Sequence, residues 1–142
     1  MKQELIFIPF FGLMILTISV WIYMYYLRLS FLKREKINPQ SVATSRQMLE
    51  VVPETVNNSS DNLKKLFELP VIFYVLCIFL FITQKVDSVN LVLAYCFVIF
   101  RIGHSFIHCT YNKVIHRFFV YMLSSFILWA LVIRSILLTI NI

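Results

Sequence analysis

The chain of 142 residues alternates between long apolar stretches and short polar connections, with one polar connection much longer than the others. Four stretches are long enough to cross a lipid bilayer, because a spanning helix needs about 20 apolar residues at a rise of about 1.5 Å each. They cover residues 5–29, 66–83, 90–111 and 118–140. The pattern therefore predicts an all-α membrane protein, a bundle of four transmembrane helices in a single domain.

The long polar segment, about residues 33–61, separates the first two apolar stretches. Within it the pattern predicts one short interfacial helix over residues 45–52, because Pro53 cannot continue a helix. The run Asn-Asn-Ser-Ser at residues 57–60 is typical of a turn. We therefore expect a polar loop that contains one short helix.

The second apolar stretch has recognisable signals at its entrance. Asp61 or Asn62 is the expected N-cap of its helix, because a short polar side chain can accept a hydrogen bond from the first free N–H groups. Pro70 suits the first turn of a helix, where its missing N–H removes no intrahelical bond. Together these signals predict that the second helix begins before Pro70.

Composition supports this assignment to the membrane. A soluble domain would be about 45–50% apolar and about 25% charged, whereas this chain is 60% hydrophobic and 14% charged. The formal net charge is +6, and most basic residues lie in the connections after the first and third stretches. The positive-inside rule therefore places these two connections in the cytoplasm and both termini outside. Because the charge follows the membrane topology, it does not indicate a nucleic-acid-binding surface.

Polar residues follow one face of the third predicted helix. Arg101, His104, His108 and Tyr111 are spaced i, i+3, i+7 and i+10, which places them on the same side of an α-helix. An arginine at mid-bilayer depth costs about 2.5–3.5 kcal/mol on insertion scales. Such residues face other helices or a water-filled pocket, so this seam is the first candidate for a functional site.

The seam is expected to form one wall of a cavity near the cytoplasmic end. Glu68 lies about one turn inside the second helix, and Arg117 and Tyr121 open the fourth helix at the same end. We expect Glu68 to pair with Arg101, since each charge lowers the cost of burying the other. The remaining chemistry suits a small anionic ligand beside lipid. Three histidines and one glutamate are too few ligands for a membrane di-metal centre, so no metal is expected.

The entrance of the second helix and the polar seam resemble two segments of the MAPEG family (membrane-associated proteins in eicosanoid and glutathione metabolism). One segment covers residues 61–74, whose Glu68 and Pro70 are similar to the family's second-helix entrance, above all in a bacterial branch. The other runs from Arg101 through Arg117 to Tyr121, with a spacing similar to the family's glutathione-binding set. The resemblance covers most of the chain.

The resemblance implies a homotrimer that binds glutathione between neighbouring subunits, near the cytoplasmic face. The implied glutathione-binding positions are Glu68, Arg101, His104, His108 and Tyr121. Arg117 is the implied catalytic residue, because a cation beside the sulfur favours the thiolate, the nucleophile of glutathione transfer. The implied activity is that of a membrane-bound glutathione transferase or peroxidase acting on a lipophilic electrophile.

Two positions depart from the family pattern. Lys65 stands where many members have an asparagine, and His108 stands where glutathione-binding members typically have a tyrosine. Two alternatives to the enzyme are therefore kept. One is a non-catalytic lipid- or ligand-binding membrane protein of the same fold. The other is an unrelated four-helix membrane protein whose polar residues only lock helix packing.

Overall fold

Helices account for most of the chain. The computed structural model describes residues 1–140, and within them it contains only helical elements and their connections. In chain order the elements are η1 (Gln3–Ile6), α1 (Phe7–Arg34), η2 (Pro39–Val42), α2 (Ser45–Val51), α3 (Glu54–Leu66), α4 (Leu69–Ile82), α5 (Ser88–Cys109) and α6 (Val114–Ile140). The all-α prediction is confirmed for these residues.

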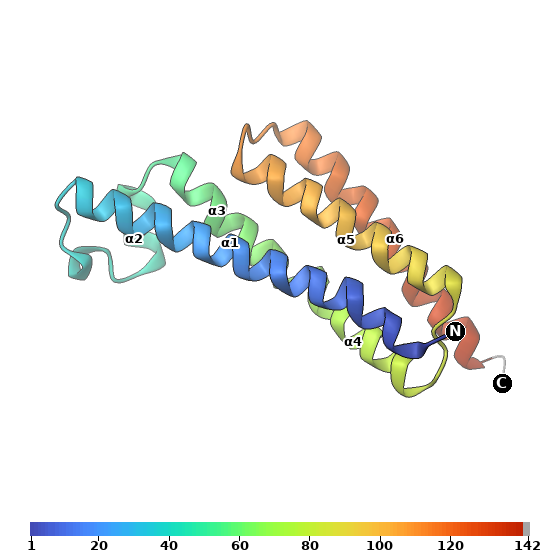
Figure 1. The fold of residues 1–142 in the computed structure, drawn as a ribbon. Helices are drawn as coiled ribbons and strands as arrows, with labels where there is room; N and C mark the ends of the chain where they lie inside the picture. Colours follow the sequence, from blue (N-terminus) through green and yellow to red (C-terminus); the bar gives the residue numbers. More distant parts are fainter. Residues whose placement is uncertain (141–142) are drawn as a thin grey trace.

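The long helices form an elongated bundle (Figure 1). α1 packs against α3 and α5, and α5 packs along α6. α3 and α4 follow one another beside α1, with a short break between them. The N-terminus and the end of α6 lie at one end of the bundle, which we call the terminal end. The connection through α2 and the α5–α6 turn lie toward the opposite end, which we call the loop end.

Four helical segments are long and apolar enough to cross a membrane. They are Gln3–Arg34, Glu54–Ile82, Ser88–Cys109 and Val114–Ile140. The prediction of a multi-pass integral membrane protein with four spans is therefore confirmed. α1 continues about one turn past the apolar stretch, and α6 begins about one turn before it. These extensions are expected, because charged residues in a helix can lie beyond the bilayer while backbone hydrogen bonding continues.

The second span differs most from its prediction. The turn predicted at residues 57–60 and the N-cap predicted at Asp61 or Asn62 are wrong, because α3 runs through all of these residues. The Asn57 side chain donates to a backbone carbonyl before the helix at 3.1 Å, and Ser59 donates to one in the preceding turn at 2.9 Å. These side chains are buried against neighbouring helices. Tertiary packing thus overrides the turn propensity of the run.

The break between α3 and α4 is explained by Pro70. A proline inside a helix lacks an N–H and its ring clashes with the carbonyl four residues earlier, which here belongs to Leu66. α3 ends at that residue, and α4 begins with Pro70 in its first turn, as predicted. Glu68 is the residue before α4, with φ −90° and ψ −104°, and its side chain makes no capping bond. Its carboxylate is therefore available to other groups.

The predicted short helix in the polar segment is present as α2. Thr44 caps it by accepting a hydrogen bond from the Gln47 backbone at 3.3 Å, while the Gln47 side chain accepts from the Thr44 backbone at 3.1 Å. This reciprocal capping box satisfies two free N–H groups. The helix ends before Pro53, at the position expected from the sequence.

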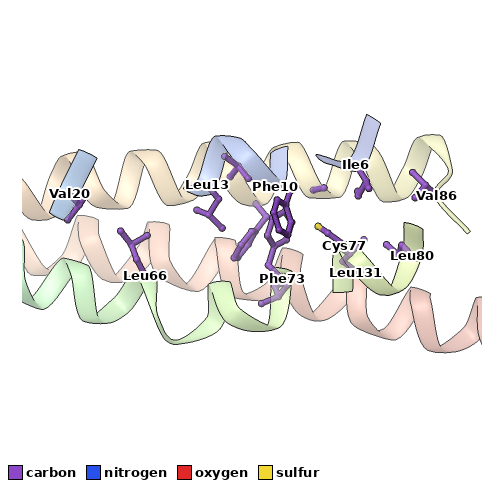
Figure 2. Close-up of a cluster of buried hydrophobic side chains, with 14 residues drawn as sticks. Ile6, Phe10, Leu13, Val20, Leu66, Phe73, Cys77, Leu80, Val86 and Leu131 are labelled. Carbon is purple, nitrogen blue, oxygen red and sulfur yellow. The ribbon is translucent and has the colours of Figure 1, made fainter. Parts of the chain in front are cut away.

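The apolar core lies between the helices, mainly in the half nearer the terminal end. Figure 2 shows Phe10 and Leu13 of α1 facing Phe73 of α4, with Cys77 beside them. The rings of Phe73 and Phe97 pack with their centroids 4.8 Å apart. Burial of such side chains in close-packed surroundings holds the helices together. The core fixes α4 and α5 relative to one another and so positions the polar residues farther along them.

The terminal end is held by a satisfied polar cluster. Arg134 of α6 forms an ion pair with Asp87 and donates to the Asn90 side chain at 3.1 Å. Asn90 is fully buried. Asp87 caps α5, because its carboxylate accepts a hydrogen bond from the backbone N–H of Asn90 at 2.8 Å. Gln3 joins the cluster from the N-terminus through two hydrogen bonds with the Val86 backbone. These bonds tie η1, α5 and α6 together.

Candidate functional site

A cavity of about 530 Å³ lies toward the loop end. Its walls come from the last turns of α3, the break before α4, the end of α5 and the start of α6. The lining residues are Asp61, Lys64, Lys65, Glu68, His104, His108, Val114, Arg117, Phe118, Tyr121 and Met122. Five of the six predicted site residues are in this lining. Arg101 is the exception.

The tight turn between α5 and α6 brings the two helices' polar residues together. Asn112 adopts φ 46°, a left-handed conformation that asparagine tolerates better than most residues. Its backbone N–H donates to the carbonyl of Ile107 at 2.9 Å and closes the end of α5. The chain then reverses, so that Arg117 in the first turn of α6 faces His108 near the end of α5.

Arg117 is held by neutral partners. Its Nη1 donates to the side-chain oxygen of Asn112 at 2.7 Å and to Nε2 of His108 at 3.4 Å. Asn112 is itself fixed, since its side-chain amide donates to Asn58 of α3 at 3.0 Å. Within residues 1–140 no carboxylate lies at ion-pair distance from Arg117. The guanidinium is thus oriented but its charge is not neutralised.

The two buried histidines have defined hydrogen-bonding roles. His104 Nδ1 lies 3.3 Å from the backbone oxygen of Arg117, which can only accept, so this nitrogen donates. The guanidinium of Arg117 can only donate, so Nε2 of His108 accepts. Nε2 of His104 and Nδ1 of His108 are buried and have no partner. Each histidine therefore lines the cavity and keeps one buried polar atom without a partner.

Arg101 lies behind the ring of Tyr121 rather than in the cavity lining. Its guanidinium carbon is 4.7 Å from the centroid of Tyr121 and 5.2 Å from that of Phe97. Arg101 is 0% exposed, and all three of its guanidinium nitrogens lack a hydrogen-bond partner. Cation–π contacts offset only part of the cost of burying such a charge. A positive charge without an anionic partner thus lies directly beneath the cavity.

The predicted pairing of Glu68 with Arg101 is wrong for this chain. Glu68 pairs with Lys65, whose Nζ lies 3.0 Å from each carboxylate oxygen. The physical reason is local: Lys65 is three residues earlier, on the last turn of the helix that ends just before Glu68. Arg101 is instead enclosed by the two aromatic rings.

The sequence did not predict Asp61 and Lys64 as site residues, and Lys65 was identified only as a departure from the family pattern at a proposed ligand position. Asp61, Lys64 and Lys65 lie on α3, one to two turns before Glu68. Their spacing of three to seven residues from Glu68 could have placed them on its side of a helix. They were assigned to the entrance of the second helix or to a basic loop instead, because the predicted helix began too late.

Charge distribution makes the cavity a candidate anion site. Asp61 is paired with Lys64 at 3.3 Å, and Glu68 with Lys65 at 3.0 Å. Arg117 and the buried Arg101 have no carboxylate partner among residues 1–140. Unused N–H groups around a cavity fit a ligand that carries acceptor oxygens or an ionised sulfur. The residues present therefore fit an anionic ligand such as a peptide thiolate with free carboxylates.

The fold and the site together define a four-span, all-helical membrane protein with a cationic cavity toward the loop end. The sequence profile of the MAPEG family matches residues 6–137, and the chain belongs to that family. No match was found among curated proteins or among solved structures.

Proposed function

We propose that this protein is a membrane-bound glutathione transferase or peroxidase that conjugates or reduces a lipophilic electrophile. Family membership supports a glutathione-related activity, since MAPEG members generally use glutathione. The observation that carries the proposal is Arg101, whose three guanidinium nitrogens are buried without a partner beside a basic cavity. Leaving such groups unsatisfied costs free energy, and an anionic ligand offsets that cost.

The roles proposed for the site residues follow their positions. Arg117 faces the sulfur and stabilises the thiolate, because a nearby cation favours the charged form of a thiol. Glu68 and Arg101 act on the charged ends of the tripeptide. Contact with Glu68 requires displacement of Lys65, and direct contact with Arg101 requires movement of the Tyr121 ring. His104 lines the cavity and positions the ligand, and a hydrogen bond through its Nε2, which is buried, requires local movement of the lining.

The remaining two positions complete the ligand set. Tyr121 flanks the ligand by stacking or by hydrogen bonding through its hydroxyl. His108, where a tyrosine is typical of the family, holds Arg117 through Nε2 and lines the cavity, while its Nδ1 is buried without a partner. His108 therefore belongs to the proposed site both through Arg117 and directly.

The chemistry proposed is thiol transfer. The thiol loses its proton, and the resulting thiolate forms a sulfur–carbon bond with the electrophile. In a substitution the leaving group departs with the electron pair of the bond that breaks. In an addition the π electrons of an activated double bond shift away from the attacked carbon onto the neighbouring carbon or a conjugated oxygen, which then takes up a proton. In the peroxidase reaction two thiols reduce a hydroperoxide to an alcohol and water and become a disulfide. A lipophilic second substrate fits a cavity built from membrane-spanning helices.

The assembly and topology proposed are a homotrimer with cytoplasmic loops and external termini. Val114 and Phe118 line the cavity and are well exposed, so a neighbouring subunit would cover an apolar rim there. The excess of basic residues at the loop end supports its cytoplasmic location. The similarity of residues 61–74 to a bacterial branch supports a bacterial-type member.

One observation favours the alternative, a non-catalytic binding protein of the same fold. Nη1 of Arg117 is already engaged by Asn112 and His108. A thiolate would have to bind the rest of the guanidinium or displace these partners. In the alternative the same cavity holds a ligand or lipid that is not turned over.

The test follows thiolate formation by ultraviolet absorbance when glutathione is added to purified protein in detergent. We expect a thiolate signal in the unaltered protein and its loss, by about tenfold or more, in Arg117→Ala, because the charge-assisted interaction is removed. Lys113→Ala is the matched control, since this exposed lysine lies on the same turn outside the cavity. An equal signal in Arg117→Ala would refute the catalytic role. Glutathione binding without any thiolate would favour the alternative.

A further inference from the structure

Both carboxylates that line the cavity are engaged by lysines of the same helix. Asp61 is bound by Lys64, and Glu68 is bound by Lys65 through both oxygens. The Lys65 ammonium also lies 5.7 Å from the centroid of Tyr121, a ring that lines the cavity. Each carboxylate in the lining is therefore already paired with a lysine, and only Glu68 has both of its oxygens engaged.

This arrangement matters for a ligand that carries charges of both signs. Glutathione has two carboxylates and one ammonium group near neutral pH. A carboxylate of glutathione suits the uncompensated charge of Arg101 and its ionised sulfur that of Arg117, but its ammonium group meets no carboxylate without a lysine partner while Lys65 is bound to Glu68. The ammonium must either displace Lys65 or remain close to it, and like charges at short range repel.

We infer that Lys65 is a specificity-determining residue that occupies Glu68 and makes the cavity prefer anionic thiol ligands whose amino group is blocked or absent. The inference rests on the proposed function, since it concerns which thiol enters the same site. The Lys65 ammonium takes the place at Glu68 that a ligand ammonium would take in a site with a free carboxylate.

A purely structural role does not account for the pair. The side chains of Lys65 and Glu68 are 44% and 46% exposed, and ion pairs at such exposure contribute little to folding stability. The pair joins the end of α3 to the break before α4, which Pro70 already determines. Its main consequence is the charge that it presents to the cavity.

The experiment compares the dissociation constants of glutathione and N-acetylglutathione, which differ only at the amino group. Both are measured by equilibrium dialysis with the purified full-length protein in detergent. The variants are Lys65→Asn, the double variant Lys65→Asn with Glu68→Gln, and the control Lys113→Asn, which removes an equal charge outside the cavity. Size-exclusion chromatography checks that each variant keeps the assembly of the unaltered protein.

We expect the unaltered protein to bind N-acetylglutathione more tightly, by about fivefold, as suits the strength of a partly exposed ion pair. Lys65→Asn should shift this ratio by about fivefold toward glutathione, because Glu68 becomes free for the ammonium. The double variant should lose that shift, and Lys113→Asn should keep the original ratio.

An unchanged ratio in Lys65→Asn overturns the inference while leaving glutathione binding intact. A shift that persists in the double variant also overturns it, because the freed carboxylate would then not be the cause. Failure of both ligands to bind any of the proteins refutes the proposed function, and the inference falls with it.

Discussion

Arg134 at the terminal end and Arg101 toward the loop end both lie on membrane-spanning helices, but their surroundings are opposite. Arg134 has a carboxylate partner in Asp87 and an amide partner in Asn90. Arg101 has two aromatic faces and no hydrogen-bond acceptor for any of its three guanidinium nitrogens. Arg134 is also partly exposed, whereas Arg101 is completely buried.

The difference supports the proposal that Arg134 serves the fold and Arg101 a binding site. A satisfied cluster closes the terminal end, where its bonds join η1, α5 and α6. An unsatisfied cation beneath a cavity costs stability in the isolated chain, and it is expected to persist where a bound anion offsets that cost. The terminal end thus resembles a structural clamp, and the loop-end cavity a binding site.

The largest expected effect comes from exchanging each arginine for leucine. Arg101→Leu should weaken glutathione binding by at least about tenfold, since a charged hydrogen-bonding group contributes about 1.5–3 kcal/mol. It should leave the apo protein equally stable or more stable, because an unpaired buried charge is replaced by an apolar group. Equilibrium dialysis and thermal melting in detergent measure the two quantities.

Arg134→Leu should give the reverse result. Removing its guanidinium leaves the buried side-chain oxygen of Asn90 without this donor, at a cost of about 1–3 kcal/mol in the free energy of unfolding. Ligand affinity should not change, because the cluster lies at the other end of the bundle. If Arg101→Leu destabilised the apo protein as strongly as Arg134→Leu, the distinction between clamp and site would be lost.

A smaller effect is expected from the asparagine that orients Arg117. Asn112→Gly keeps a residue that tolerates the positive φ of the turn but removes the hydrogen bond to Arg117. The loss of one such bond, about 0.5–1.5 kcal/mol, should weaken the thiolate signal by about 2–12-fold. Asn90→Ala is the counterpart at the terminal end and should lower the melting temperature without changing the thiolate signal. The opposite pattern in the two variants would contradict the assignment.

The smallest effect concerns the pH dependence of the clamp. Partial burial raises the pKa of the Asp87 carboxyl, but hydrogen bonds from the Asn90 backbone and from Arg134 outweigh it, so the pKa is lowered from its usual 3.8. A lowered pKa in the folded state stabilises the protein above pH 3.8, and this stabilisation is lost as the pH falls through the folded-state pKa. As the pH is lowered below 3.8, the melting temperature of the unaltered protein should therefore fall more steeply than that of Asp87→Asn. Parallel curves for the two proteins would show that Asp87 contributes nothing to the acid dependence.

The spans of this protein were predictable because each depends on local sequence. An apolar run of sufficient length fits the bilayer whatever its neighbours are, and all four predicted stretches correspond to helices that can span it. The position of Pro70 in the first turn of α4 was also predictable, because the effects of its missing N–H and of its ring extend over only one helical turn. The capped short helix α2 was predictable for the same reason.

Other features of the fold depended on packing. Residues 57–60 have the composition of a turn, yet they are helical, because Asn57 and Ser59 donate to nearby carbonyls and are buried where α3 packs against its neighbours α1 and α5. Helical periodicity correctly placed His104 and His108 near the same cavity wall. It also grouped Arg101 with them, although this residue lies one turn deeper, behind Tyr121.

The sequence by itself determined the membrane class, the four spans and most of the residues that gather at the loop end. Only the tertiary structure decided the partners of those residues. Glu68 has Lys65 within reach, three residues earlier on the last turn of α3, while Arg101 is enclosed by aromatic rings from α5 and α6. The physical reason is that helix formation depends on neighbours along the chain, whereas the pairing of a charge depends on which groups the packed helices bring within about 3–4 Å.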